Sequence, residues 1–174
     1  MKKSFLSLFI IAVCIISSYG QQSGENLKII WPEEYKWKVG SNQEDKSVHM
    51  IELIPGNETL EKWSMMGNML SIKGAKNVPM DVAVNMTFEQ ATKQAPKAKL
   101  TVLEKDEKAK NPWVLFKIEA PNFINDKNPE SQLYYIIQGN DALYSNFIAL
   151  KEKSLKEDFV NKWMKIFKAS ELVY

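Results

Sequence analysis

The chain has 174 residues, and its 23 basic residues, all lysine, outnumber its 21 acidic residues to give a formal net charge of +2. Loss of Lys2 and Lys3 with the leader described below leaves 21 of each sign, and a neutral chain lacks the basic surface that attracts nucleic acid or acidic membranes. The absence of arginine also argues against a dedicated bidentate site for phosphate or carboxylate. We therefore expect no nucleic-acid partner.

The N-terminus has the layout of a secretory signal peptide. Met1–Lys3 is basic, Phe5–Ile16 is apolar, and small residues lead to Gly20. The pattern predicts cleavage near Gly20 and a periplasmic or extracellular location. Lipoprotein anchoring through Cys14 is the alternative. The apolar run of about 12 residues is shorter than the ~20 that a membrane span needs, so we expect no stable membrane insertion.

Cys14 is the single cysteine of the chain. After cleavage the protein would have no disulfide, no thiol nucleophile and no cysteine metal ligand. About 154 residues would remain, enough to fold around one core without covalent links. We divide the chain into a signal peptide at 1–20, a disordered lead-in at 21–26 and a single α+β domain at 27–174, which we expect to be a monomer.

The first part of the domain predicts a hairpin and a short helix. Residues 35–39 alternate as a half-buried strand does, residues 40–45 have turn chemistry, and residues 48–54 form the second strand. Asn57–Trp63 then predicts a short helix, and a strand is expected at 69–73.

The second part predicts two amphipathic helices separated by four strands. Pro79 suits the first position of a helix over 79–94. The four strands are expected at 99–104, 113–119, 132–138 and 143–150. The last helix begins with the capping-box pattern Ser154–Glu157 and carries an apolar stripe centred on Trp163. Hairpin links between strands predict an α+β fold with a largely antiparallel sheet.

Three features of this order are similar to one known family. Pro55–Trp63 leads from a strand into a short helix, Gly139–Tyr144 turns into a long strand, and a terminal helix with central Trp163 follows. Over roughly Trp31–Val173 the chain resembles the PsbP-like family. The resemblance implies a central antiparallel sheet flanked by helices, an α/β/α sandwich, and an accessory or binding role more than catalysis. No functional residue is carried over, because no site motif is present to match.

The inventory of reactive residues is sparse. His49 is the only histidine, whereas common metal sites need several histidine or cysteine ligands, and no Gly-x-Ser-x-Gly nucleophile pattern occurs. The acid pairs Glu33–Glu34, Glu44–Asp45 and Asp106–Glu107 indicate solvated loops, and the loop 122–128 has too few acids for calcium. We expect no catalytic residue, no metal and no cofactor.

The aromatic content is the remaining positive feature. Large rings usually pack in cores, but Trp31 and Trp37 could also line a surface for a partner protein or a small apolar ligand. The favoured function is an exported, non-enzymatic binding or accessory protein of the cell envelope, with ligand or partner unknown. The alternative is a secreted hydrolase that uses carboxylate, Ser, Tyr or Lys chemistry. A pocket that gathers two acids with raised pKa values would favour the hydrolase, and an exposed aromatic patch of roughly several hundred Å² would favour binding.

Overall fold

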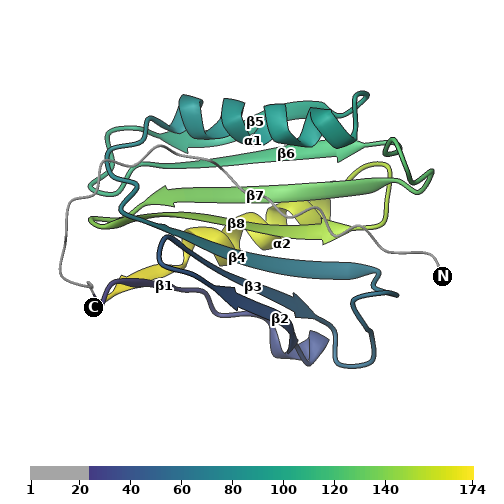
Figure 1. The fold of residues 1–174 in the computed structure, drawn as a ribbon, viewed down its shortest axis with the longest axis horizontal. Coiled ribbons are helices and arrows are strands. Elements are labelled where there is room, and N and C mark those ends of the chain that lie inside the picture. The colour runs from purple at the N-terminus through teal and green to yellow at the C-terminus, as the bar shows by residue number, and fades with distance from the viewer. Residues whose placement is uncertain (1–23) are drawn as a thin grey trace.

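A computed structural model of the protein describes residues 24–174, so the signal peptide, Cys14 and the cleavage site near Gly20 lie outside the described residues. The described chain forms a seven-stranded antiparallel sheet with the strand order β2-β3-β4-β8-β7-β6-β5 (Figure 1). Its strands are β2 (Lys38–Glu44), β3 (Val48–Ile54), β4 (Met65–Lys73), β5 (Lys99–Asp106), β6 (Trp113–Ala120), β7 (Glu130–Gln138) and β8 (Ala142–Leu150).

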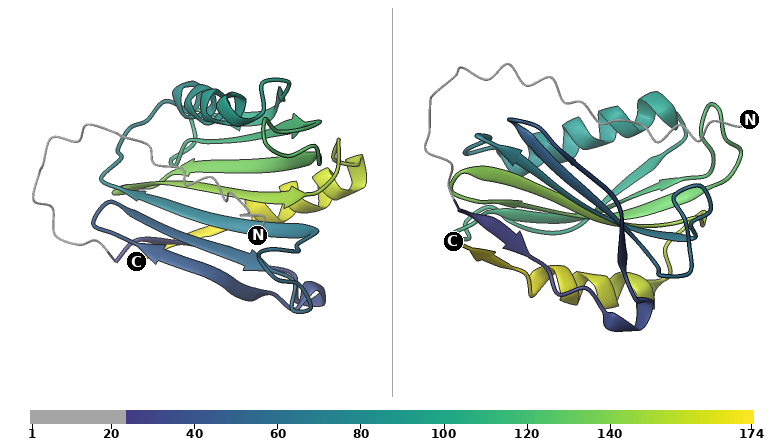
Figure 2. Two further views of the ribbon diagram at one scale, coloured as in Figure 1. Left: turned by 45° about the vertical axis from the view of Figure 1, so that its right-hand side comes forward. Right: turned by 60° about the horizontal axis from the view of Figure 1, so that its bottom comes forward.

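Two helices and a small second sheet complete the described fold. Helix α1 (Met80–Gln94) and helix α2 (Glu157–Lys168) lie on opposite faces of the twisted sheet (Figure 2). Strand β1 (Asn26–Lys28) pairs with β9 (Glu171–Val173). The α+β class with an antiparallel sheet is confirmed, but a single helix on each face covers the sheet less completely than the expected α/β/α sandwich would.

The N-terminal hairpin forms between different residues from those expected. Glu33–Tyr35 is a turn of 3-10 helix, and Lys36 has a φ of 49° in the left-handed region, so the strand predicted at 35–39 begins at Lys38 instead. The predicted turn at 40–45 is mostly strand, with a bulge between Val39 and Ser41. Strand β3 has the predicted bounds, and the hairpin itself is confirmed.

The helix predicted at Asn57–Trp63 is absent. This segment is a turn with a bridge between Thr59 and Lys62, and the Glu58 carboxylate accepts hydrogen bonds from the backbone N–H and the hydroxyl of Ser64 at 2.8 and 2.5 Å. Short helices are costly to nucleate, and such side-chain bonds offer the backbone an alternative. The following strand is longer than expected and begins at Met65.

The later elements match the sequence closely, except at the start of α2. Helix α1 and strands β5 to β8 lie within about two residues of their expected bounds. The capping box at Ser154–Glu157 does not form, because Lys156 is the N-cap and makes no side-chain cap. Leu155 is instead buried, and its N–H donates to Glu119 Oε1 at 2.9 Å.

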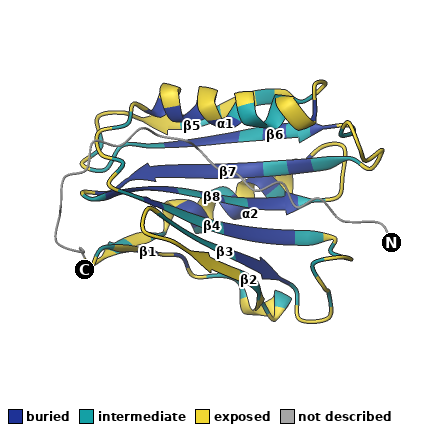
Figure 3. Ribbon diagram, in the orientation of Figure 1, coloured by how far each residue is buried: buried dark blue, intermediate teal, exposed yellow. Residues whose placement is uncertain are grey.

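The hydrophobic core has two main parts, one on each face of the sheet. On the α2 face, Trp163 and Phe167 pack against Leu115, Leu133 and Tyr135. On the α1 face, the core gathers under the helix over β6, β7 and β8. Burial is therefore highest in the middle of the sheet, with β7 buried along most of its length and β2 exposed (Figure 3).

The N-terminal residues that the structure describes are fixed by contacts with the other end of the chain. Glu25 and Asn26, which the sequence assigned to a disordered lead-in, are ordered here. Glu25 accepts a hydrogen bond from the Asn140 N–H at 2.8 Å, and Asn26 pairs with Val173. The two ends of the described chain therefore lie side by side.

Candidate ligand-binding cleft

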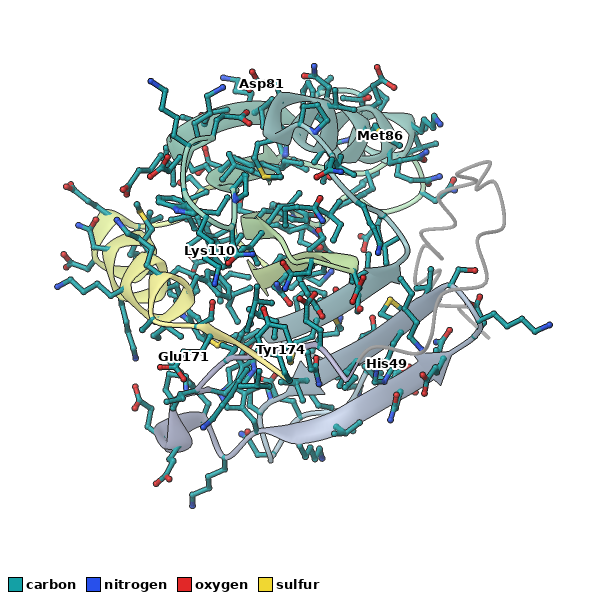
Figure 4. The ribbon with its side chains drawn as sticks, turned by 90° about the vertical axis from the view of Figure 1, so that its left-hand side faces the viewer. His49, Asp81, Met86, Lys110, Glu171 and Tyr174 are labelled. Atoms are coloured by element: carbon teal, nitrogen blue, oxygen red, sulfur yellow. The ribbon has the colours of Figure 1, made fainter. Side chains whose placement is uncertain are left out.

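Helix α1 and the open part of the sheet border a large cavity in the described part of the chain. Its volume is ≈ 1250 Å³, above the range of about 300–1,000 Å³ usual for small-molecule sites. The floor comes from β3, β4, β8 and β7, and α1 forms one wall. In the side view of Figure 4, α1 with Asp81 and Met86 lies at the top and β3 with His49 lies below.

Strand register explains how side chains from four strands meet on this floor. Glu52 of β3 pairs with Asn68 of β4, Asn68 pairs with Phe147 of β8, and Phe147 pairs with Tyr134 of β7. Directly paired residues of antiparallel strands project to the same face. These four residues thus form one row across the floor, and all four line the cavity.

The surfaces around this row are mainly apolar. Met66 and Leu70 flank the row on β4, and Trp63 lies beyond them toward one end. Val82 and Met86 of α1 line the cavity and are exposed, although they are large apolar side chains. Exposed apolar side chains that face a concave surface are typical of a site for an apolar ligand.

The polar groups along β7 satisfy one another. The Tyr134 hydroxyl donates to Gln132 Oε1 at 2.6 Å, and the Gln132 amide donates to Glu130 Oε1 at 2.7 Å. Glu130 also forms an ion pair with Lys151 at 2.6 Å, and the Lys151 ammonium lies 4.0 Å from the centre of the Trp63 ring. Burial raises the pKa of Tyr134 well above its ordinary value, so this hydroxyl stays protonated.

Glu52, on the β3 side of the floor, is different. Its exposed fraction is 4 %, and its Oε2 atom is buried with no hydrogen-bond partner among the described residues. Burial raises the pKa of its carboxyl group, and a side-chain hydrogen bond with Ser41 offsets part of that effect. A buried carboxylate without a counter-charge is costly, so Glu52 is the chemically unsatisfied group of the cleft.

Trp31 and Trp37 lie away from this cleft. Both are half-buried and pack against the core cluster of the α2 face, with ring centroids 5.4 and 6.2 Å from that of Trp163. The backbone of Gly67 lies directly beneath Trp31, since a Cβ atom at this glycine would be 2.4 Å from Trp31 Cζ3. Both tryptophans therefore pack against the core on the α2 face, and neither lines the cleft under α1.

His49 also lies outside the cleft, beside a small cavity of ≈ 40 Å³. It is paired across the strands with Glu44 and Ser71, a composition that could suggest a hydrolytic triad. The contacts are different: His49 Nε2 is 2.9 Å from Asn42 Oδ1, and Glu44 binds Lys73 at 2.6 Å. Within residues 24–174, no hydrogen bond joins His49 to Ser71.

The other candidate groups named from the sequence do not form a reactive centre in the described part of the chain. Asp126 accepts hydrogen bonds from the backbone and side-chain amides of Asn128, as in a turn. No cluster of three or more His, Cys, Asp or Glu side chains suited to a metal ion occurs between residues 24 and 174. None of the helices in this range is long and apolar enough to cross a membrane.

Sequence reasoning missed both the cleft and Glu52. A signal for Glu52 was present, because Met50 and Ile54 share its face by strand alternation and are apolar. Glu52 is therefore a charged residue between two apolar residues on the face of β3 that is turned toward the core. The cleft itself had no local signal, since its floor depends on which strands become neighbours.

No protein-family model and no curated protein matches the chain.

Proposed function

We propose that the protein is an exported, non-enzymatic binding protein that holds a small, largely apolar ligand between α1 and the sheet. The observation that carries this proposal is the mainly apolar cavity of ≈ 1250 Å³. An apolar concave surface of this size with a few polar groups has the usual character of a ligand site. The signal-peptide pattern at residues 1–20 supports the export part of the proposal.

The hydrolase alternative has less support than binding. Paired acid chemistry needs a second carboxyl group that is free to act with the first. Two other carboxylates line the cleft: Glu130 is already engaged by Lys151 and Gln132, and Asp126 accepts the hydrogen bonds of the Asn128 turn. The contacts of His49 with Asn42, described above, do not support a nucleophile-activating role.

The PsbP-like resemblance remains a part of the proposal, as does the α/β/α layering that it implies. The terminal helix with Trp163 supports this relationship. The missing helix at 57–63 counts against it.

Filling the cleft tests the binding function. We would titrate the exported protein with the uncharged fluorescent dye Nile red and compare it with Ser145→Phe. Ser145 lies on the cleft floor between β4 and β7 neighbours, so a phenyl ring there should occupy ligand space and weaken dye binding. Thr101→Phe adds the same bulk at an exposed position of β5 outside the cleft and should leave binding unchanged.

Two results would contradict the proposal. One is equal dye binding by the two phenylalanine variants, with both folded. The other is a hydrolytic activity, found with a panel of ester, peptide and glycoside substrates, that disappears in His49→Ala. We expect His49→Ala to bind Nile red as the unmodified protein does.

A further inference from the structure

Glu52 is the buried carboxylate of the cleft, and it has no positive partner among the described residues. Eight ion pairs occur among the described residues, and none involves Glu52. Its Oε2 is buried and accepts no hydrogen bond from any residue of the described range, and the residue as a whole is only 4 % exposed. A carboxylate oxygen in such surroundings needs a donor.

The residues next to Glu52 in the sheet do not supply a positively charged hydrogen-bond donor. Ser41 of β2 and Asn68 of β4 are its paired neighbours, and both are uncharged. Met50 and Ile54, the next residues on the same face of β3, are apolar. In the described part of the chain, the Glu52 carboxylate is therefore an acceptor without a neighbouring cation.

The position of Glu52 in the cleft is suited to recognition of a ligand head group. It lies in the same row as Asn68, Phe147 and Tyr134. The end of this row on β3 and β4 therefore carries polar side chains, and the end on β8 and β7 carries aromatic rings. The apolar residues Met66 and Leu70 lie on either side of the row. A ligand with one cationic end and an apolar body would match this distribution of groups.

We propose that the ligand class is an apolar amine, whose ammonium group pairs with the Glu52 carboxylate while its hydrocarbon body lies along the cleft. This inference rests on the proposed binding function and specifies its ligand. A buried charge pair requires both partners, and a ligand cation supplies the one that the protein lacks. An alcohol would give a hydrogen bond without the charge, and a carboxylate would be repelled by Glu52.

A matched set of amphiphiles tests this inference on the unmodified protein. Dodecylamine, dodecanol and dodecanoate have the same chain and differ in the head group, so each is used to displace Nile red below its aggregation concentration. We expect dodecylamine to bind most tightly and dodecanoate most weakly. Equal displacement by all three compounds, or preference for dodecanoate, would overturn the inference.

The variant Glu52→Gln keeps the shape of the side chain and removes its charge. We expect its affinity for dodecylamine to fall roughly tenfold or more, the usual result of removing one partner of a buried charge pair, with little change for dodecanol. Glu104→Gln is the matched control, because it removes the same charge from an ion-paired glutamate of β5 that does not line the cleft. A preference for the amine that survives in Glu52→Gln would also overturn the inference.

The experiment separates this inference from the proposed function. If Nile red does not bind to the unmodified protein and no amphiphile shifts its melting temperature, the binding function and the amine inference both fail. If the dye binds and the head group makes no difference, the amine inference alone fails. Amine preference that is lost in Glu52→Gln and kept in Glu104→Gln supports both.

Discussion

Replacement of Trp163 by alanine should remove the central packing contact of α2. The side chain is fully buried, and its ring lies 5.7 Å from that of Phe167 and 5.4 Å from that of Trp31, centroid to centroid. A buried tryptophan covers about 150–250 Å², which at ~25 cal/mol per Å² corresponds to about 4–6 kcal/mol. This is an upper value, because denatured chains already hide some surface.

We therefore expect Trp163→Ala to lower the free energy of unfolding by about 3–5 kcal/mol, as other large aromatic residues do. Its Nε1 has no hydrogen-bond partner among the described residues, so the loss is one of packing alone. Urea unfolding followed by circular dichroism measures the effect. Typical urea dependences of ~1–3 kcal/mol per M convert this loss to a midpoint shift of about 1–5 M.

Exposed Lys165 on the same helix provides the control, since surface substitutions usually change stability by no more than about 0.5 kcal/mol. Trp163→Phe, a smaller truncation, should be destabilised less than Trp163→Ala and remains measurable if the alanine variant does not fold. A shift for Trp163→Ala as small as that of Lys165→Ala would show that α2 does not pack on the sheet through this residue.

Three other predictions concern the packing of Trp31, the charge of Glu52 and export. Gly67→Ala should destabilise the protein by about 1–3 kcal/mol in urea, because the new Cβ would overlap the Trp31 ring, and Trp31→Leu in the same chain should reduce that effect. Glu52→Gln should melt at a higher temperature than the unmodified protein at neutral pH, and the difference should shrink as the pH falls through the raised pKa of folded Glu52 toward the ordinary glutamate pKa of 4.5. The intact mass of exported protein should correspond to a chain that begins at Gln21.

The pH effect has a definite sign. Burial raises the pKa of Glu52 in the folded protein, so the folded state holds this proton more tightly than the unfolded state does. The stability from this group is complete below the unfolded pKa and is lost as the pH rises through the folded pKa. Glutamine carries no charge at any pH and avoids that loss. A Glu52→Gln variant that melts lower than the unmodified protein at neutral pH would refute this account.

The other two predictions have equally clear contrary results. An undiminished urea midpoint for Gly67→Ala would mean that the Trp31 ring does not lie against that glycine. A mass that retains Met1, or one that begins with a lipid-modified Cys14, would contradict cleavage near Gly20.

Some elements could be predicted because their signals are local. The stripe that contains Trp163 has helical spacing, and the alternation Val114, Phe116, Ile118 has strand spacing, so each pattern fits one kind of element. Both were found where expected and on the faces expected. The amphipathic patterns therefore indicated the antiparallel α+β class, whatever the final strand order.

Local signals failed where other contacts competed with them. Before α2, Leu155 is buried and its N–H donates to Glu119 of β6, and the N-cap of the helix is Lys156 instead of Ser154. The short helix at 57–63 was replaced by a turn that Glu58 stabilises. At these positions the free energy differences between alternative local structures are small, about 1 kcal/mol for a cap, so one additional hydrogen bond decides the outcome.

The sequence by itself determined the two long helices with their apolar faces, the strands with clear alternation and the shortage of reactive side chains, since these depend on local spacing and on composition. The tertiary structure alone decided that β4 pairs with β8, which places Glu52 and Asn68 in one row with Phe147 and Tyr134 and leaves a cavity beneath α1. Pairing between strands far apart in the chain depends on how whole faces pack together. For this reason the cleft and the position of Glu52 in it follow from the pairing of the strands and could not be predicted from the sequence.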